Sequence, residues 1–229
     1  MKNLITIGLP SKGRLKNKSI SFFNDRGLKI LQSDKERNYF ASIENNSNIK
    51  IIYLHAKEII QRLGDGTLDI GISGLDLLYE SEKNLQNKIE VKIKLNFGSA
   101  NLVIAVPDDW IDVQTVADLE EVAFEFKDKK KVRLRVATKY PNLTREFLFS
   151  KGVTQIKLVS SLGATEAYPF TGSSEIITDI TSTGETLRAN NLRILKDGEI
   201  LKSEACMMIS KSAHKSSSLK KLVKLLSKN

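Results

Sequence analysis

Short runs of β-branched and aliphatic residues recur along the chain, and segments with helical periodicity lie between them. The extended runs predict strands at 4–10, 49–55, 68–74, 90–98, 100–107, 131–140, 155–161, 175–181 and 204–210. The periodic segments predict helices at 17–28, 56–66, 76–85, 113–126, 142–153, 185–192 and 216–229. The last of these places its apolar side chains on one face, namely Leu219, Leu222, Val223 and Leu226.

Alternating strands and helices predict an α/β protein with mainly parallel sheets covered on both faces. The strands are too many for one modest sheet, and no Ser/Pro-rich linker marks a serial boundary. We therefore expect two discontinuous lobes, the first from 1–98 plus 207–229 and the second from 99–206. Such a fold binds its ligand in the cleft between the lobes, against the carboxyl ends of strands.

Composition narrows the class of protein. The chain has 229 residues, and none of its apolar runs approaches the ~20 residues of a membrane span. Its start reads as a first strand rather than a signal peptide, so we expect a cytoplasmic protein. One cysteine, Cys206, excludes an internal disulfide framework. His55 and His214, far apart in sequence, argue against structural zinc and a Ser-His-Asp hydrolase.

The formal net charge of +9 fits either a nucleic-acid binder or an enzyme for polyanionic small molecules. The positive residues are scattered, with clusters at 127–135 and in the C-terminal helix, and no aromatic residues are interleaved to stack bases. The pattern of most of these lysines is typical of a solvated protein surface. Charge alone leaves the choice open.

The stretch "DITSTGETL" ends a strand in a small, hydroxyl-rich turn. The turn consists of Ser182, Thr183, Gly184, Glu185 and Thr186. Small residues let the backbone close around an anion, with the N–H groups of the following helix pointing at it. Asp179 would accept hydrogen bonds from sugar hydroxyls beside that phosphate. The alternative is a plain helix start with Ser182 or Thr183 as N-cap.

Two further strand ends carry similar turns. In "GLPSKGRL", Pro10 and Gly13 shape a turn from which Lys12 and Arg14 project, either toward phosphates or as two surface cations. In "LDIGISGLDLL", the strand ends at Gly74 and a helix opens at Asp76, whose simplest role is N-cap. Together the three turns predict one cleft with at least two anion subsites.

The sequence resembles the catalytic subunit of the ATP phosphoribosyltransferase family, in its short form. The resemblance rests on "LPSKGRL", "GDGTLDIGISGLDLL", "VATKYPNLTREF" and "GATEAYPFTGSSEIITDITSTGETLRANNL", which follow the family's order across nearly the whole chain. It implies a two-lobed type II periplasmic-binding-protein-like fold with the active site in the cleft. It also implies an enzyme that condenses ATP with phosphoribosyl pyrophosphate in the first step of histidine biosynthesis.

The same resemblance implies roles for single residues. The turn 182–186 matches the site of the 5′-phosphate, while Asp179 and Glu166 match acids near the ribose. Lys12 and Arg14 match cations that reach the pyrophosphate and the ATP phosphates, and Arg37 matches another cleft arginine. The candidates for nucleotide contacts are Gly13, His55, Gly74 and Asp76. Mg²⁺ would arrive with the substrate, without protein ligands.

Three residues depart from the family pattern. Tyr168 replaces a small residue before Pro169, and Glu175 replaces an aspartate. His55 stands where arginine is usual, so it offers a weaker, pH-dependent charge to the nucleotide, or no ligand role at all.

The implied partners are ATP, phosphoribosyl pyrophosphate and a regulatory subunit similar to histidyl-tRNA synthetase. The implied assembly is a hetero-octamer, with the catalytic chain alone a homodimer, and neither nucleic acid nor membrane is expected. Two alternatives stay open. One is a non-enzymatic anion-binding or sensor module on the same fold, and the other is a phosphoribosyltransferase for a different base.

Overall fold

The computed structural model describes residues 4–32, 39–213 and 217–227. The chain divides into two compact units, one of residues 1–98 with 204–229 and the other of residues 99–203. The chain therefore returns to the first unit at residue 204, three residues earlier than the predicted boundary after Cys206. The reason is pairing, because Ala205 and Cys206 already lie opposite Gly74 and Ser73 in the sheet of the first unit.

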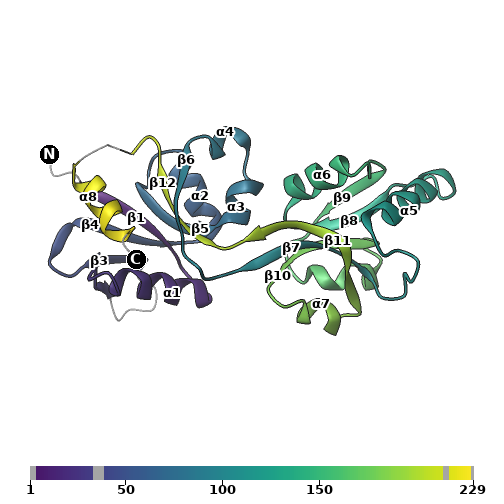
Figure 1. Ribbon diagram of the computed structural model, residues 1–229, viewed down its shortest axis with the longest axis horizontal. Helices are drawn as coiled ribbons and strands as arrows, with labels where there is room; N and C mark the ends of the chain where they lie inside the picture. Colours follow the sequence, from purple (N-terminus) through teal and green to yellow (C-terminus); the bar gives the residue numbers. More distant parts are fainter. Residues whose placement is uncertain (1–3, 33–38, 214–216, 228–229) are drawn as a thin grey trace. The chain divides into compact units, whose positions relative to one another are not determined.

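The first unit is built on a seven-stranded sheet in the order β2-β3-β4-β1-β5-β12-β6 (Figure 1). Its strands are β1 (Ile5–Pro10), β2 (Ile30–Gln32), β3 (Phe40–Ile43), β4 (Asn46–Leu54), β5 (Ile70–Gly74), β6 (Ile89–Lys94) and β12 (Ala205–Ser210). β1 pairs in parallel with β4 and β5, so the carboxyl ends of these three strands meet at one edge. That edge carries the predicted turns of this unit.

Helices cover both faces of this sheet. They are α1 (Gly13–Asn24), α2 (Ala56–Gly64), α3 (Leu75–Glu80), α4 (Lys83–Gln86) and α8 (Ser217–Leu226). Phe22 and Phe23 of α1 share a core with Leu219 and Leu222 of α8. The other face packs against α2 and α3 in a separate core that includes Cys206. Burial raises the pKa of the Cys206 thiol to about 11.

The second unit has a five-stranded sheet in the order β11-β7-β10-β8-β9. Its strands are β7 (Ala100–Pro107), β8 (Leu134–Thr138), β9 (Ile156–Ser160), β10 (Ile176–Thr181) and β11 (Leu192–Ser203). Its helices are α5 (Val116–Asp128), α6 (Pro141–Ser150), α7 (Glu185–Ala189) and the 3₁₀ turns η1 (Thr165–Ala167) and η2 (Pro169–Thr171). β8, β9 and β10 run parallel, and their carboxyl ends share one edge. The prediction of mainly parallel sheets is nevertheless wrong, because six of the ten strand pairings among the described residues are antiparallel.

Two predicted helices differ from the structure by more than three residues at an end or by a break. The segment 76–85 forms α3 and α4 instead of one helix, because Ser81 adopts an extended conformation between them. The Ser81 hydroxyl donates to the Leu78 carbonyl oxygen at 2.6 Å, and the Gln86 amide donates to the Ser81 carbonyl oxygen at 2.7 Å. α1 begins at Gly13, four residues before the predicted start. No helix in the described ranges is long and apolar enough to span a bilayer.

Candidate functional site

The turn after β1 is short and tied to its neighbour. The Ser11 N–H donates to the Leu54 carbonyl oxygen at 2.9 Å, which joins the end of β1 to the end of β4. Lys12 is the N-cap of α1, and Gly13 follows with φ +68°, a conformation that favours glycine. Lys12 and Arg14 are both exposed. The two cations therefore lie at a helix start, not on the longer turn that we predicted.

His55 has a local structural role. It is the exposed N-cap of α2, and its Nδ1 accepts a hydrogen bond from the Lys57 N–H at 3.3 Å. This contact supports the structural interpretation of His55, as a helix cap, over a contact to the nucleotide.

Gly74 and Asp76 form the third predicted turn, but Asp76 is not the N-cap that the sequence indicated. Gly74 is the N-cap of α3, while Asp76 lies in the first helical turn and is only 6% exposed. A Cβ atom at Gly74 would lie 2.3 Å from the Asp76 Oδ1, so a side chain there would displace the carboxylate. Close approach of the carboxylate, rather than a positive φ, accounts for the glycine.

In the second unit, the turn 182–186 follows β10 and is closed by its own hydroxyl groups. The Gly184 N–H donates to the Thr181 Oγ1 at 2.9 Å, and the Glu185 N–H donates to the Thr183 Oγ1 at 3.3 Å. The Ser182 hydroxyl donates to the Ser99 carbonyl oxygen at 3.1 Å. These bonds hold the turn in one compact conformation.

Gly184 is the N-cap of α7, with φ +74°, so the alternative in which Ser182 or Thr183 is the N-cap is wrong. Only glycine adopts this backbone without strain. Within the described ranges, the N–H groups of Thr183 and Thr186 have no acceptor. Both side chains are exposed. The turn therefore presents free donors, which is the arrangement that binds anions.

Asp179 lies in β10 just before this turn and is half-buried. Burial raises the pKa of its carboxyl group, and the negative charge of Glu166 in η1 raises it further. The Ile180 N–H and the charge of Lys139 lower the pKa again. Asp179 and Glu166 are thus close enough to affect each other electrostatically.

Lys139 was not singled out from the sequence. It directly follows Thr138, which lies opposite Thr178 in the parallel pairing of β8 and β10. Lys139 and Asp179 therefore occupy equivalent positions at neighbouring strand ends. The signal in the sequence was "ATKYP", a lysine placed just after a strand.

A buried hydroxyl cluster supports these strand ends and was also missed. The Thr144 Oγ1 lies 3.1 Å from the Thr138 Oγ1 and 2.7 Å from the Thr178 Oγ1. The Tyr140 N–H donates to the Thr138 Oγ1 at 2.9 Å. All three threonines are at most 1% exposed. The cluster fixes β8, α6 and β10 against one another.

Two departures from the family pattern have a structural basis. The Glu175 carboxylate accepts from the Arg135 Nε at 3.0 Å, from its Nη2 at 2.6 Å and from its backbone N–H at 2.7 Å. The longer acid thus joins β8 to the start of β10. Tyr168 packs beside the core that contains Ile177 and Leu187, so a large residue fills space there.

The predicted residues fall into two groups. Lys12, Gly13, Arg14, His55, Gly74 and Asp76 follow strand ends of the first unit, whereas Glu166, Asp179 and the turn 182–186 belong to the second. Arg37 lies outside the described residues. Over the ranges that the structure describes, three or more His, Cys, Asp or Glu side chains never gather closely enough to hold a metal ion.

Comparison with known proteins gives consistent matches. Residues 55–228 match the model of the family "HisG: ATP phosphoribosyltransferase". The ATP phosphoribosyltransferase of Brucella melitensis biotype 2 is 45% identical over 213 residues, which cover 93% of this chain and 92% of the relative. That of Brucella anthropi is 44% identical over 210 residues, 91% of each chain.

Solved structures agree on the fold. The ATP phosphoribosyl transferase (HisG:HisZ) complex from Thermotoga maritima contains a chain that matches with TM-score 0.75 and 23% identity, over 97% of this chain and 96% of that one. The arginine-, lysine-, histidine-binding protein ArtJ from Geobacillus stearothermophilus matches with TM-score 0.55 and 11% identity, over 96% and 88%. The chain therefore has the type II periplasmic-binding-protein-like fold that the sequence predicted.

Proposed function

We infer the reaction from one premise, which is that this chain belongs to the ATP phosphoribosyltransferase family. ATP phosphoribosyltransferase carries out the first step of histidine biosynthesis. In this reaction N1 of the adenine ring of ATP attacks C1′ of phosphoribosyl pyrophosphate. A C–N bond forms, the C1′–O bond breaks, and pyrophosphate leaves with the electron pair. The adenine nitrogen already carries a lone pair, so alignment and charge neutralisation supply most of the catalysis.

We propose that the turn 182–186 binds the 5′-phosphate of phosphoribosyl pyrophosphate. The free N–H groups of Thr183 and Thr186 support this role, as do the hydroxyls of the turn and the tight backbone at Gly184, whose φ of +74° favours glycine. Glu185 opens α7 and directs a negative charge at its start. Its place in the turn fits a contact to a ribose hydroxyl better than a contact to phosphate.

Asp179 and Glu166 would hold the ribose hydroxyls. An ionised carboxylate only accepts hydrogen bonds, and both of its oxygens are available to hydroxyl donors. Lys139 favours the ionised form of Asp179 against the burial that opposes it. Lys139 therefore acts on the substrate through Asp179.

Lys12 and Arg14 would neutralise the leaving pyrophosphate. Their place at the start of α1 supports this, because two permanent cations and the helix N-terminus all favour an anion. Arg37 would add a third cation. Gly13, Gly74 and Asp76 are the proposed nucleotide contacts, with His55 a weaker one because its Nδ1 already caps α2.

Phosphoribosyl transfer normally uses a metal, and we propose that Mg²⁺ enters as part of the phosphoribosyl pyrophosphate complex. We also propose that the chain works in the cytoplasm, as a homodimer alone and as a hetero-octamer with a regulatory subunit similar to histidyl-tRNA synthetase. The HisG:HisZ complex from Thermotoga maritima supports such a partner.

Pyrophosphate release tests the proposal. Purified protein receives ATP, phosphoribosyl pyrophosphate and Mg²⁺, and the absorbance of the nucleotide product is followed in parallel. We expect release only when both substrates are present. Replacing ATP by another purine or pyrimidine substrate tests the enzyme for a different base. Absence of turnover with every acceptor, even with a regulatory subunit added, would favour the non-enzymatic binding module.

A further inference from the structure

The three threonines of the buried hydroxyl cluster form a closed ring. The Thr144 Oγ1 contacts both of the others, and the Thr178 hydroxyl donates to the Thr138 Oγ1 at 2.5 Å. A hydroxyl has one proton to donate, and all three protons are used when Thr138 donates to Thr144 and Thr144 donates to Thr178. We call the side chains of Thr138, Thr144 and Thr178 the threonine ring.

The threonine ring lies where the backbone pairing of β8 with β10 ends. Thr138 and Thr178 are the last paired residues of the two strands, so Lys139 and Asp179 are the first residues beyond the ladder. On its other side Asp179 remains paired with β7, opposite Val103. The side chains of the ring therefore set the distance of Asp179 from the end of β8.

The ring and Asp179 lie on opposite faces of the sheet, because successive side chains of a strand alternate between its faces. Thr178 faces α6, which carries Thr144, whereas Asp179 shares the face of Ile177, which packs with Leu187 of α7. Figure 1 shows α6 and α7 on opposite sides of the sheet. Thr144 is 0% exposed, so it affects a ligand of Asp179 only through the strand.

A second pair of buried hydroxyls lies behind Glu166. The Ser161 Oγ is 2.8 Å from the Thr165 Oγ1, and both side chains are at most 4% exposed. The Ser161 N–H donates to the Thr138 carbonyl oxygen at 3.0 Å, which joins this pair to the threonine ring. Glu166 thus directly follows a buried threonine, as do the two charged residues at the ends of β8 and β10.

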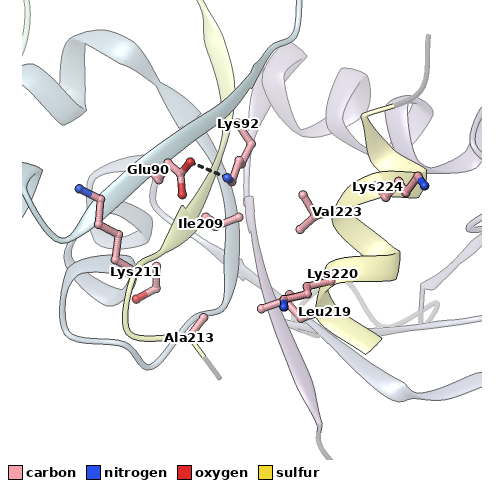
Figure 2. Close-up of a pocket in the computed structure, with 10 residues that line it drawn as sticks. Glu90, Lys92, Ile209, Lys211, Ala213, Leu219, Lys220, Val223 and Lys224 are labelled. Carbon is pink, nitrogen blue, oxygen red and sulfur yellow. Dashed lines mark hydrogen bonds and ion pairs between the residues drawn. The ribbon is translucent and has the colours of Figure 1, made fainter. Parts of the chain in front are cut away.

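The lysines beside α8 make a contrast. They line a pocket of about 560 Å³ in the first unit, and Figure 2 shows the ammonium groups of Lys211 and Lys224 directed away from it. A lysine carries its charge on a flexible four-carbon stem. The carboxylate of Asp179 is one carbon from the backbone, so the position of the strand decides where this charge lies.

We propose, on the basis of the function proposed above, that Thr144 is a positioning residue for phosphoribosyl pyrophosphate. Its hydroxyl closes the threonine ring, which holds the end of β10 against the end of β8. Asp179 is thereby kept at the place and angle at which its carboxylate meets the ribose hydroxyls. A displacement of about 1 Å in such a group is enough to weaken binding or turnover strongly.

Three substitutions separate the hydroxyl of Thr144 from the bulk of its side chain. Thr144→Val keeps the shape and removes the hydroxyl, Thr144→Ser keeps the hydroxyl and removes the methyl group, and Thr144→Ala removes both. Without the hydroxyl, the Thr138 proton loses its acceptor in the ring and the ring opens.

We expect Thr144→Val and Thr144→Ala to raise the KM for phosphoribosyl pyrophosphate by about tenfold, because a contact to this substrate is misplaced. The KM for ATP and kcat should change by less than about threefold. Thr144→Ser should stay within about threefold of the natural chain in all three constants. Steady-state pyrophosphate release measures them.

Leu148→Ala is the matched control for a general loss of stability. Leu148 lies on the same helix and is fully buried, but it belongs to the apolar core of the second unit and carries no hydroxyl. This variant should lower the melting temperature at least as much as Thr144→Val does. Its KM for phosphoribosyl pyrophosphate, measured well below the melting temperature, should stay within about twofold of the natural value.

A double-mutant cycle tests whether Thr144 acts through Asp179. Calorimetric titration with phosphoribosyl pyrophosphate and Mg²⁺ gives the Kd of the natural chain, Thr144→Val, Asp179→Asn and the double variant. Thr144→Val should weaken binding about tenfold in the natural chain and less than about twofold once Asp179 is replaced.

Failure of this proposal differs from failure of the proposed function. A natural chain that neither binds phosphoribosyl pyrophosphate nor releases pyrophosphate would overturn both. With an active natural chain, an unchanged KM in Thr144→Val or an equal rise in Leu148→Ala would overturn the role of Thr144 alone. So would a tenfold effect that persists in Asp179→Asn. If Thr144→Val does not fold, equal KM values for Thr144→Ser and Thr144→Ala would overturn it instead.

Discussion

Arg14 is a residue whose proposed role is electrostatic, since it is exposed at the start of α1 and carries a permanent charge. Arg14→Ala should lower turnover by about a hundredfold, because one preorganised donor to developing charge is lost. Steady-state pyrophosphate release measures the effect. The control is Lys18→Ala, which removes a cation one turn further along the same helix. Near-normal activity of Arg14→Ala would remove Arg14 from the mechanism.

Asp179 combines a cost in stability with a role in binding. Because burial raises its pKa, the folded chain holds the proton more tightly than the unfolded chain. The resulting penalty on the ionised carboxylate is complete above the folded pKa and disappears as the pH falls below the unfolded value of about 3.9. Asp179→Asn removes this penalty.

We therefore expect Asp179→Asn to be more stable than the natural chain at neutral pH and equally stable near pH 3 to 4. Binding of phosphoribosyl pyrophosphate should nevertheless fall by about a hundredfold. Thermal melts across pH and calorimetric titration at pH 7.5 give the two measurements, with the exposed Asp109→Asn as control. A variant less stable than the natural chain at neutral pH would contradict the argument.

At the scale of elements, the strands with continuous apolar runs and the amphipathic helices were predictable. β1, β4, β5, β7 and β10 all overlap the predicted strands, and α8 buries Leu219, Leu222 and Leu226 as its pattern required. Periodicity identifies such elements because each buries one face or both.

The elements that were missed lack that signal. β11 contains "KDG" in its middle, which reads as a turn, yet the strand continues across it. Its pairing with β7 shifts register between Ile194 and Glu199, so the polar residues are accommodated in an irregularity of the ladder. β2 and β3 are short and form a sheet edge, where burial imposes little pattern.

The candidate site was predictable only in part. The sequence located the turns at Gly13, Gly74 and Gly184, because small residues directly after an apolar run are typical of a tight turn from a strand into a helix. It did not predict which residue caps each helix, since that depends on the backbone conformation of the glycines. Lys139 and the hydroxyl cluster depend on strand register, which a single sequence does not reveal.

The Arg135–Glu175 pair offers a test at this scale, since it joins β8 to the start of β10. Glu175→Asp shortens the acid, so it cannot reach both the guanidinium and the Arg135 N–H. We expect a loss of about 1 kcal/mol in the free energy of unfolding, modest because the Arg135 side chain is 37% exposed. Urea denaturation measures the loss, and Glu120→Asp, at an exposed position on α5, is the control. No loss in Glu175→Asp would show that the pair adds nothing to stability.

At the scale of the whole molecule, each of the four core clusters among the described residues draws on one unit only. Leu222 is 6% exposed in a core of the first unit, and Leu119 is fully buried in a core of the second. Either leucine changed to alanine should cost about 2–5 kcal/mol.

The loss of stability should appear only in the unit that contains the substitution. Hydrogen exchange followed by mass spectrometry should show faster exchange across 4–98 and 204–213 in Leu222→Ala, and across 99–203 in Leu119→Ala. Uniform acceleration over both units in either variant would show that the chain opens as one body instead.

The single cysteine also has a practical consequence. Cys206 is fully buried, and its pKa of about 11 leaves almost no thiolate at neutral pH. Maleimide reagents need an accessible thiolate, so they should not modify Cys206 in the folded chain. A cysteine introduced at an exposed position such as Ser217 would then carry a dye or spin label by itself. The natural sequence thus serves directly as a background for site-specific labelling, with Cys206 left in place.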